Sequence, residues 1–248
     1  MRIAVVTDIH GNLTAFEAVL ADLRAMAPDA IVHGGDLADS GSSPVEIVDR
    51  IRELGWAGVA GNTDEMLFRP ASLEEFAAQS TAPPALWAAT REMAAATRAL
   101  LGEERLAWLR SLPRLQVWED TALVHGSAAS CWRAPAAGAG DEELEAAYGT
   151  LGRPTAVYGH IHTPFLRTLG RDGSRPGMVA NTGSVGLPWD GDARASYLLA
   201  DGESLKIRRV AYAVEREVRQ RTASGLPYAE WIAGMLRSGR PQMPPAAP

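Results

Sequence analysis

The chain has 248 residues, of which 46% are hydrophobic and 22% are charged, and its formal net charge is −6 at pH 7. These proportions are those of an ordinary globular protein, so they argue against a disordered chain. No apolar stretch reaches the roughly 18 residues that a membrane-spanning helix needs. The negative charge gives no general attraction to nucleic acid. We therefore expect neither a membrane nor nucleic acid in general as a partner.

The cysteine content and the start of the chain indicate the compartment. Cys131 is the single cysteine, which excludes an internal disulfide framework and is typical of the reducing cytoplasm. The first apolar run begins almost at the N-terminus and a candidate ligand follows at Asp8, which leaves no room for a cleaved signal sequence. The sequence therefore predicts a cytoplasmic protein.

Strands and helices are predicted to alternate over the first quarter of the chain. Short apolar runs predict strands over residues 3–6, 30–32 and 56–60. Apolar residues at helical spacing predict helices over residues 13–26 and 44–54. This β-α-β-α-β order is typical of a partly parallel sheet covered by helices.

The pattern then changes twice. Residues 64–112 are predicted to be helical, with interruptions at Pro70 and at Pro83-Pro84, and they carry no chemical motif, so we expect them to flank or roof a site. Strands are predicted over residues 115–118, 121–124, 156–158, 178–180, 196–200 and 205–213, followed by a helix over 214–221 and another after Pro227. Residues 1–239 are predicted to form one domain, and the proline-rich tail 240–248 is predicted to be disordered.

Four of the five histidines belong to a dispersed series of polar residues that follow predicted strands. The series is Asp8-Ile9-His10, Gly35-Asp36, Gly61-Asn62-Thr63-Asp64, His125-Gly126 and Gly159-His160-Ile161-His162. The ends of parallel strands meet at one edge of a sheet, so these side chains are expected to converge there. Residues two apart in an extended segment point the same way, so Asp8 and His10 can hold one ion, and His160 and His162 are available one to each ion. Imidazole, carboxylate and amide ligands suit Mn²⁺, Fe, Zn²⁺ or Co²⁺ better than copper or Ca²⁺.

In this order, the five blocks resemble the signature of the calcineurin-like metallophosphoesterase superfamily (D-x-H, G-D, G-N-H/D, H, G-H-x-H). Further blocks at 181–186 and 190–192 extend the resemblance over nearly the whole chain, toward the branch of small prokaryotic phosphodiesterases and phosphatases. The resemblance implies an α/β fold, a four-layer α/β/β/α sandwich of two mixed sheets.

The resemblance also implies two divalent metal ions, most plausibly Mn²⁺, with Fe, Zn²⁺, Co²⁺ or Ni²⁺ as alternatives. One ion would be held by Asp8, His10, Asp36 and His162, and the other by Asp36, Asn62, His125 and His160. In the family's chemistry a hydroxide between ions about 3.5–4 Å apart attacks the phosphorus in line with the leaving oxygen. The implied reaction is hydrolysis of a small phosphomonoester or phosphodiester, such as a nucleotide.

The chain departs from the family pattern directly after Asn62. Many members carry a histidine there that protonates the leaving group, whereas this chain has Thr63 and then Asp64. Asp64 is predicted to accept hydrogen bonds that orient a neighbouring ligand or cap the next helix. The alternative is proton transfer, which needs a raised pKa. Without a strong acid, the reaction should favour substrates with good leaving groups.

Substrate contacts are predicted at four positions, Asn12, Arg69, Arg133 and Ser184. The two arginines could clamp phosphate, although isolated arginines in an arginine-rich chain more often lie on the surface. The loop of Ser184 is expected mainly to support the site. His33 is predicted to be packed and hydrogen-bonded rather than a ligand. The seven tryptophans are expected to pack in the core or a lid rather than to stack on bases.

Two other functions remain open at this point. A serine/threonine-type protein phosphatase would act on phosphopeptides but not on diesters. A non-catalytic scaffold with this fold, like the phosphoesterase-like subunit of retromer, would serve as a binding surface, although it need not keep all seven predicted ligands. The sequence makes no prediction of the oligomeric state.

Overall fold

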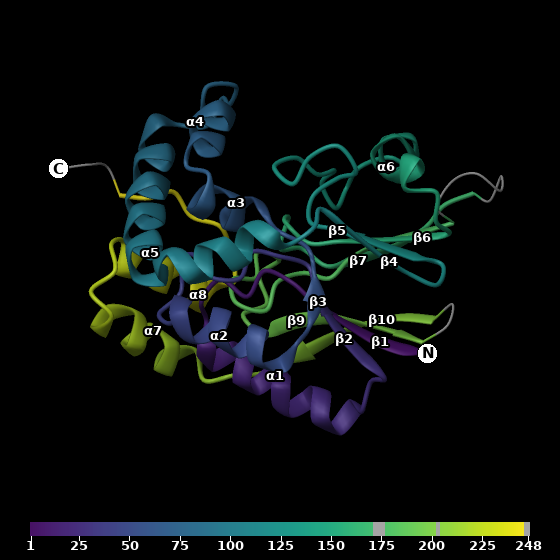
Figure 1. The fold of residues 1–248 in the computed structure, drawn as a ribbon, viewed down its shortest axis with the longest axis horizontal. Helices are drawn as coiled ribbons and strands as arrows, with labels where there is room; N and C mark the ends of the chain where they lie inside the picture. The colour runs from purple at the N-terminus through teal and green to yellow at the C-terminus, as the bar shows by residue number, and fades with distance from the viewer. Residues whose placement is uncertain (171–176, 202–203, 246–248) are drawn as a thin grey trace.

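A computed structural model describes residues 1–170, 177–201 and 204–245 of the chain. Two five-stranded sheets are stacked face to face and covered by helices on their outer sides (Figure 1). The strands are β1 (Arg2–Val6), β2 (Ala30–His33), β3 (Ala57–Gly58), β4 (Leu115–Trp118), β5 (Thr121–Val124), β6 (Thr155–Tyr158), β7 (Phe165–Thr168), β8 (Met178–Asn181), β9 (Ala195–Asp201) and β10 (Ser204–Val210). The helices are α1 (Leu13–Met26), α2 (Pro44–Leu54), α3 (Asn62–Phe68), α4 (Ala71–Ala77), α5 (Pro84–Ser111), α6 (Asp141–Tyr148), α7 (Val214–Ala223) and α8 (Ala229–Ser238), with a short 3₁₀ turn at Gly149–Leu151. The predicted four-layer sandwich is confirmed.

Both sheets are mixed. The first has the order β10-β9-β1-β2-β3, in which β1, β2 and β3 are parallel and β9 and β10 form an antiparallel hairpin. The second has the order β4-β5-β6-β8-β7, in which β5, β6 and β8 are parallel between two antiparallel edge strands. The parallel strands of both sheets therefore have carboxyl ends at which loops can build a site.

Alternation along β1 shows how the layers are held together. Ile3 and Val5 point into the core between the two sheets, where they join Leu123 and Val157 of the second sheet. Ala4 and Val6 point the other way, into the core beneath α1 and α2. This period of two lets a strand bury both faces, as expected for a sheet between two layers. On the outer side of the second sheet, β5, β6 and β8 pack against α6.

Some elements differ from the sequence prediction. β3 is only two residues long, because the backbone N–H of Ala60 donates to the carbonyl of Pro113 rather than continuing the ladder with β2. α6 was not predicted, since it buries only Leu144 and Tyr148 and so shows little helical periodicity. β7 was also missed, because this edge strand has no fully buried residue.

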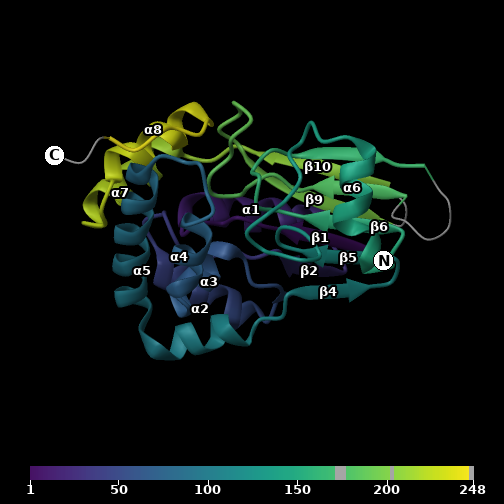
Figure 2. The ribbon, with the colours of Figure 1, turned by 90° about the horizontal axis from the view of Figure 1, so that it is seen from above.

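A lobe of helices, α3, α4, α5, α7 and α8, lies at one end of the sandwich (Figures 1 and 2). In the described chain, none of the helices is both long and apolar enough to cross a membrane. Part of the tail predicted to be disordered packs against this lobe, since the indole N–H of Trp231 in α8 donates to the carbonyl of Gln242 at 3.0 Å. Residues 246–248 of that tail lie outside the described chain.

A buried arginine joins α7 to the loop after β2. Arg221 is 1% exposed, and its guanidinium donates to the carbonyls of Ser40 and Leu226 at 2.8 Å each and to that of Pro227. Three backbone carbonyls, one in the loop after β2 and two in the loop after α7, therefore accept their hydrogen bonds from this one side chain.

We expect Arg221→Met to lower the free energy of unfolding by about 3 kcal/mol, because it leaves these buried carbonyls without a donor. Urea denaturation measures the change. Arg219→Met, on the exposed side of the same helix, is the matched control and should change stability by less than about 0.5 kcal/mol. Equal effects of the two substitutions would contradict this account.

Candidate metal centre

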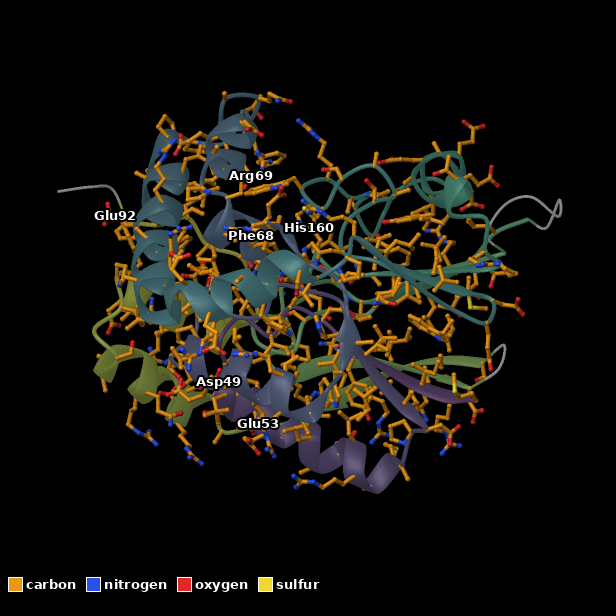
Figure 3. The ribbon with its side chains drawn as sticks, viewed as in Figure 1. Asp49, Glu53, Phe68, Arg69, Glu92 and His160 are labelled. Carbon is orange, nitrogen blue, oxygen red and sulfur yellow. The ribbon has the colours of Figure 1, made fainter. Side chains whose placement is uncertain are left out.

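All seven predicted ligands lie together where the sheets meet the helical lobe. The loop after β1 carries Asp8 and His10, the loop after β2 carries Asp36, and Asn62 begins α3. His125 follows β5, and His160 and His162 follow β6. Figure 3 shows His160 at this junction. All seven residues follow parallel strands, so the topology of both sheets brings their side chains together.

Four of the residues form a compact cluster. Potential ligand atoms of Asp8, His10, Asp36 and His162 all lie within 4.8 Å of one another, and all four residues are buried. Nε2 of His162 is 3.2 Å from Oδ1 of Asp8. Nε2 of His10 is 3.7 Å from Oδ2 of Asp36. This cluster is the set that the resemblance assigns to one ion.

The other three predicted ligands, Asn62, His125 and His160, form a second group next to Asp36. Oδ1 of Asn62 lies 2.9 Å from Nε2 of His125 and 2.8 Å from Nδ1 of His160. Oδ2 of Asp36 lies 3.4 Å from Nε2 of His125. The same oxygen of Asp36 therefore faces a histidine of each group, which is the position that a bridging ligand requires.

Hydrogen bonds fix the tautomers of three of the histidines. Nδ1 of His10, His125 and His162 lies 3.0, 2.8 and 2.5 Å from the carbonyls of Asp39, Gly34 and Leu187, respectively. A carbonyl can only accept, so each Nδ1 carries the proton and each Nε2 of a neutral ring presents a lone pair. A metal-binding histidine usually donates the N–H of its other ring nitrogen in this way, which orients the ring.

The donor set fits cations. The Nε2 atoms of His10 and His162 are 3.1 Å apart. With both Nδ1 atoms protonated, these are two lone pairs facing one another, which is unfavourable unless a cation or an additional proton lies between them. Imidazole and carboxylate donors of this kind suit divalent transition metals.

The charges of the centre support the same conclusion. Burial, together with a neighbouring histidine, lowers the pKa of His10 and of His160 to about 4, so both rings are neutral. Burial opposes ionisation of Asp36, but His125 and His10 hold the pKa of its carboxyl well below the usual range. Burial also disfavours a charge on His125, but Asp36 and Asp8 raise its pKa to about 9. Metal binds ionised carboxylates and neutral imidazoles, so an ion at this centre would displace the proton that His125 carries beside Asp36 when no ion is bound.

Most of the ligands sit in left-handed backbone conformations. The φ angles of Asp8, His10, Asp36, His160 and His162 lie between 50° and 67°. The expectation that these residues lie on extended segments is therefore wrong, because tight turns and not strand alternation direct the side chains, although Asp8 and His10 do lie in one cluster. Each such residue costs of the order of 1 kcal/mol and clusters of them are typical of functional sites.

The side chain of Asp64 stabilises the turn that carries Asp36. Its carboxylate accepts hydrogen bonds from the backbone N–H groups of Asp36, Leu37 and Gly61 at 2.8, 2.9 and 3.0 Å. Burial and the charge of Asp36 raise the pKa of Asp64 to about 6. The side chain is fully buried and does not line the cleft described below, so its position agrees with the orienting role rather than with proton transfer.

Two glycines make this close approach possible. Gly35 has φ +88°, and a Cβ on it would lie 2.4 Å from the backbone nitrogen of Gly61. A Cβ on Gly61 would lie 2.0 Å from Oδ1 of Asp36. The turns after β2 and β3 can therefore touch only because both residues lack a side chain.

A cleft of about 370 Å³ opens onto the centre. His10, Asp36, Asn62, His160 and His162 form its floor. Its walls are largely apolar and include Thr63, Met66, Phe76, Leu86, Trp87, Met93, Trp132, Leu187, Trp189, Trp231, Ile232, Met235, Pro241, Gln242 and Met243. Four of the seven tryptophans thus face the cleft, which the sequence did not indicate. Among the lining residues of the described chain there is no lysine or arginine.

The structure places the four predicted substrate contacts outside this lining. Asn12 caps α1 by accepting from the N–H of Ala15, and its amide donates to the carbonyl of Gly186. The hydroxyl of Ser184 donates to the carbonyl of Asp8 at 2.7 Å. Both residues are buried supports of the turns, so their polar groups face backbone rather than a substrate.

The two arginines are occupied elsewhere. Arg69 forms ion pairs with Glu65 and Glu75 on the helical side of the molecule (Figure 3). It lines a smaller cavity of about 280 Å³ that touches His125 from another side. Arg133 lies over the ring of Phe76 at 5.2 Å, and its guanidinium donates to Gln79. Neither guanidinium is placed to clamp a phosphate in the main cleft.

His33 is packed as predicted but is not hydrogen-bonded. Neither ring nitrogen has a partner among the described residues, and burial lowers its pKa to about 4. A Cβ on Gly58 would lie 2.3 Å from the ring, so the imidazole lies flat against this glycine. The missing hydrogen bond corrects the prediction, and the tight packing explains it.

Residues 1–204 match the calcineurin-like phosphoesterase superfamily domain. The chain belongs to this superfamily. The family binds divalent metals and hydrolyses phosphoric esters, which agrees with the cluster of aspartates and histidines described above.

Similar proteins cover the same length. An uncharacterised protein of Methanocaldococcus jannaschii is 30% identical over 257 aligned residues, which cover 96% of this chain and 98% of that protein. The crystal structure of a metallophosphoesterase from Sphaerobacter thermophilus is 28% identical, with a TM-score of 0.78 and coverage of 96% of this chain and 99% of that one. A hypothetical protein from Pyrococcus horikoshii, 18% identical, shares the fold with a TM-score of 0.81 over 97% of this chain and 99% of its own.

Asp64→Asn should weaken metal binding, because an amide nitrogen would face one of the three N–H groups that the carboxylate now accepts. We expect the affinity for Mn²⁺ to fall about 10- to 100-fold, the usual effect of removing a group that orients metal ligands. Isothermal titration calorimetry measures the affinity. Asp141→Asn, at an exposed position on α6, is the control. Unchanged Mn²⁺ affinity in a folded Asp64→Asn protein would contradict the orienting role.

Proposed function

We propose that the protein is a dinuclear metal-dependent phosphoesterase that hydrolyses a small phosphomonoester or phosphodiester. One observation carries the proposal: Oδ2 of Asp36 lies between two groups of metal-binding side chains, 3.7 Å from Nε2 of His10 and 3.4 Å from Nε2 of His125. A cleft of small-molecule size opens directly onto both groups.

The proposed ligands follow from the two groups. Asp8, His10, Asp36 and His162 would hold one ion, and Asp36, Asn62, His125 and His160 the other, with Mn²⁺ as the first choice. Such ions supply positive charge to phosphoryl oxygens and lower the pKa of water, so that no side chain of the protein has to act as the base. The buried carbonyl contacts of His10, His125 and His162 keep their rings oriented, and Asp64 keeps Asp36 in place.

The protein supplies no obvious acid for the leaving group. Thr63 lines the cleft where many relatives carry a histidine, and a hydroxyl does not donate its proton readily near neutral pH. Asp64 lies behind the turn. The departing oxygen must therefore leave with little help from a side chain of the enzyme.

The two alternative functions have less support. The 370 Å³ cleft suits a small molecule better than a phosphorylated protein segment. A scaffold would not need seven converging ligands with fixed tautomers. The single cysteine, Cys131, is buried and forms no disulfide, and we include a cytoplasmic location in the proposal.

The test is hydrolysis of bis(p-nitrophenyl) phosphate and p-nitrophenyl phosphate with Mn²⁺ present. Asp36→Asn should reduce kcat by about 10³-fold or more, since it weakens a ligand shared by both ions and each tenfold loss is about 1.4 kcal/mol. Asp141→Asn should keep full activity. Chelation should abolish turnover, and Mn²⁺ should restore it. Activity that survives both Asp36→Asn and chelation would refute the proposal.

A second prediction follows from the missing acid. Across a series of substituted phenyl phosphates, log kcat/KM should fall steeply as the pKa of the leaving phenol rises. Thr63→His should flatten this dependence and help the poorest leaving groups most, because it places an acid beside the cleft. A dependence that is already flat in the unaltered protein would show that another group protonates the leaving oxygen.

A further inference from the structure

The walls of the cleft differ in character from its floor. The floor is made of ionisable metal-centre residues, whereas the walls are aromatic side chains, methionines and aliphatic groups drawn from α3, α4, α5, α8 and the tail. Apart from Asp36 and Asp39, both buried, no described wall or floor residue is Asp, Glu, Lys or Arg. Any charge on a bound substrate can therefore be balanced only at the floor.

Aromatic groups line two parts of the cleft wall, and one of them contacts the metal centre. The rings of Phe76 and Trp132 are 5.0 Å apart and inclined by 32°, and Trp87 meets Phe76 edge to face at 5.7 Å. Trp189 stacks on His162 with ring centroids 4.0 Å apart. A planar group that contacts these rings can thus be attached to a phosphoryl group at the floor.

Three residues of the cleft also carry polar atoms without partners. Nε1 of Trp87, Nε1 of Trp189 and the hydroxyl of Thr63 are buried and make no hydrogen bond within the described chain. A purely hydrocarbon ligand would leave these donors unsatisfied. A ring with nitrogen or oxygen acceptors could satisfy them after small side-chain rotations.

We propose that the cleft selects esters in which a single phosphoryl group is joined to an uncharged heteroaromatic group, such as a nucleoside. It would discriminate against sugar phosphates, which have no ring to stack, and against polyphosphate chains, whose additional charges would meet neutral walls. This inference rests on the proposed function, because it places the phosphoryl group at the metal centre.

The decisive comparison uses adenosine 5′-monophosphate and ribose 5-phosphate with the Mn²⁺-loaded full-length protein. Both release a primary 5′-hydroxyl, so leaving-group chemistry is matched and only the base differs. We expect kcat/KM to be about 10- to 100-fold higher for the nucleotide, the range that stacking of one base supplies. Adenosine 5′-triphosphate has a better leaving group than the monophosphate, so the two are compared by KM, which should be higher for the triphosphate.

Trp87→Leu should reduce the ratio of kcat/KM for the nucleotide to kcat/KM for ribose 5-phosphate about tenfold, whereas Trp87→Phe should retain most of this preference. Trp118→Leu, in β4 and outside the cleft lining, is the matched control. A second readout needs no turnover: equilibrium dialysis should show saturable binding of adenosine that Trp87→Leu weakens about tenfold, and no binding of ribose.

The outcomes separate the two proposals. Equal kcat/KM values for the nucleotide and the sugar phosphate, with no binding of adenosine, would overturn this inference and leave the phosphoesterase intact. Efficient hydrolysis of octyl phosphate with no preference for the nucleotide would also overturn it, because apolarity alone would then suffice. Failure to hydrolyse any ester, with adenosine binding that depends on Trp87, would refute the phosphoesterase and support the aromatic selectivity of the cleft.

Discussion

The turns that follow β1 and β2 are the constraint on which the rest of the structure depends. Backbone N–H groups of Asp8, His10 and Gly11 donate to the carbonyls of Gly35, Asp36 and Leu37 at 2.8–3.0 Å, so the two turns are joined along their length. Asp64 holds the second turn from behind. These bonds stabilise left-handed residues that are unfavourable in isolation, and they set the directions of the carboxylates. The two packed sheets form a rigid frame that stabilises these strained turns.

The same frame also determines the electrostatics of the centre, because it buries ionisable side chains close to one another. Buried carboxylates and imidazoles within a few ångströms shift one another's pKa values in opposite directions, and burial magnifies the effect. The protein has thus concentrated negative charge and neutral lone pairs in one small region. An arrangement of this kind is costly without cations, and it is retained where cations are part of the function.

Much of the fold could be predicted from the sequence, and so could the residues that converge at the candidate metal centre. Asp8, Asp36 and His125 could be predicted because each follows closely on an apolar run. Such a run marks a strand, and its end can be located from the local sequence alone. α6 and β7 could not be found, because elements at the edge of the structure bury too few residues to show a period. The left-handed φ of His10 could not be predicted either, because the backbone N–H of His10 donates to the carbonyl of Asp36, which lies 26 residues further along the chain.

The cleft was the least predictable part. Trp87, Trp132, Trp189 and Trp231 are spread over more than half of the chain and converge only through tertiary packing, so no spacing in the sequence links them. For the same reason, arginines that looked suitable for phosphate turned out to be held by glutamates or by an aromatic ring. A site built from motifs can be predicted, whereas a site built from packing cannot.

The C-terminal part of the chain, α8 and the segment after it, contributes to the cleft wall but not to the group of predicted ligands. All seven converging ligands lie within residues 1–204, the part that matches the superfamily, whereas Trp231, Met235 and Gln242 of the cleft wall lie beyond it. Mutations, insertions or exchanges at the 3′ end of the coding sequence can therefore reshape what enters the cleft while the reacting centre stays untouched. Selectivity can then diversify among relatives faster than chemistry, and a tag fused to the C-terminus would alter the former first.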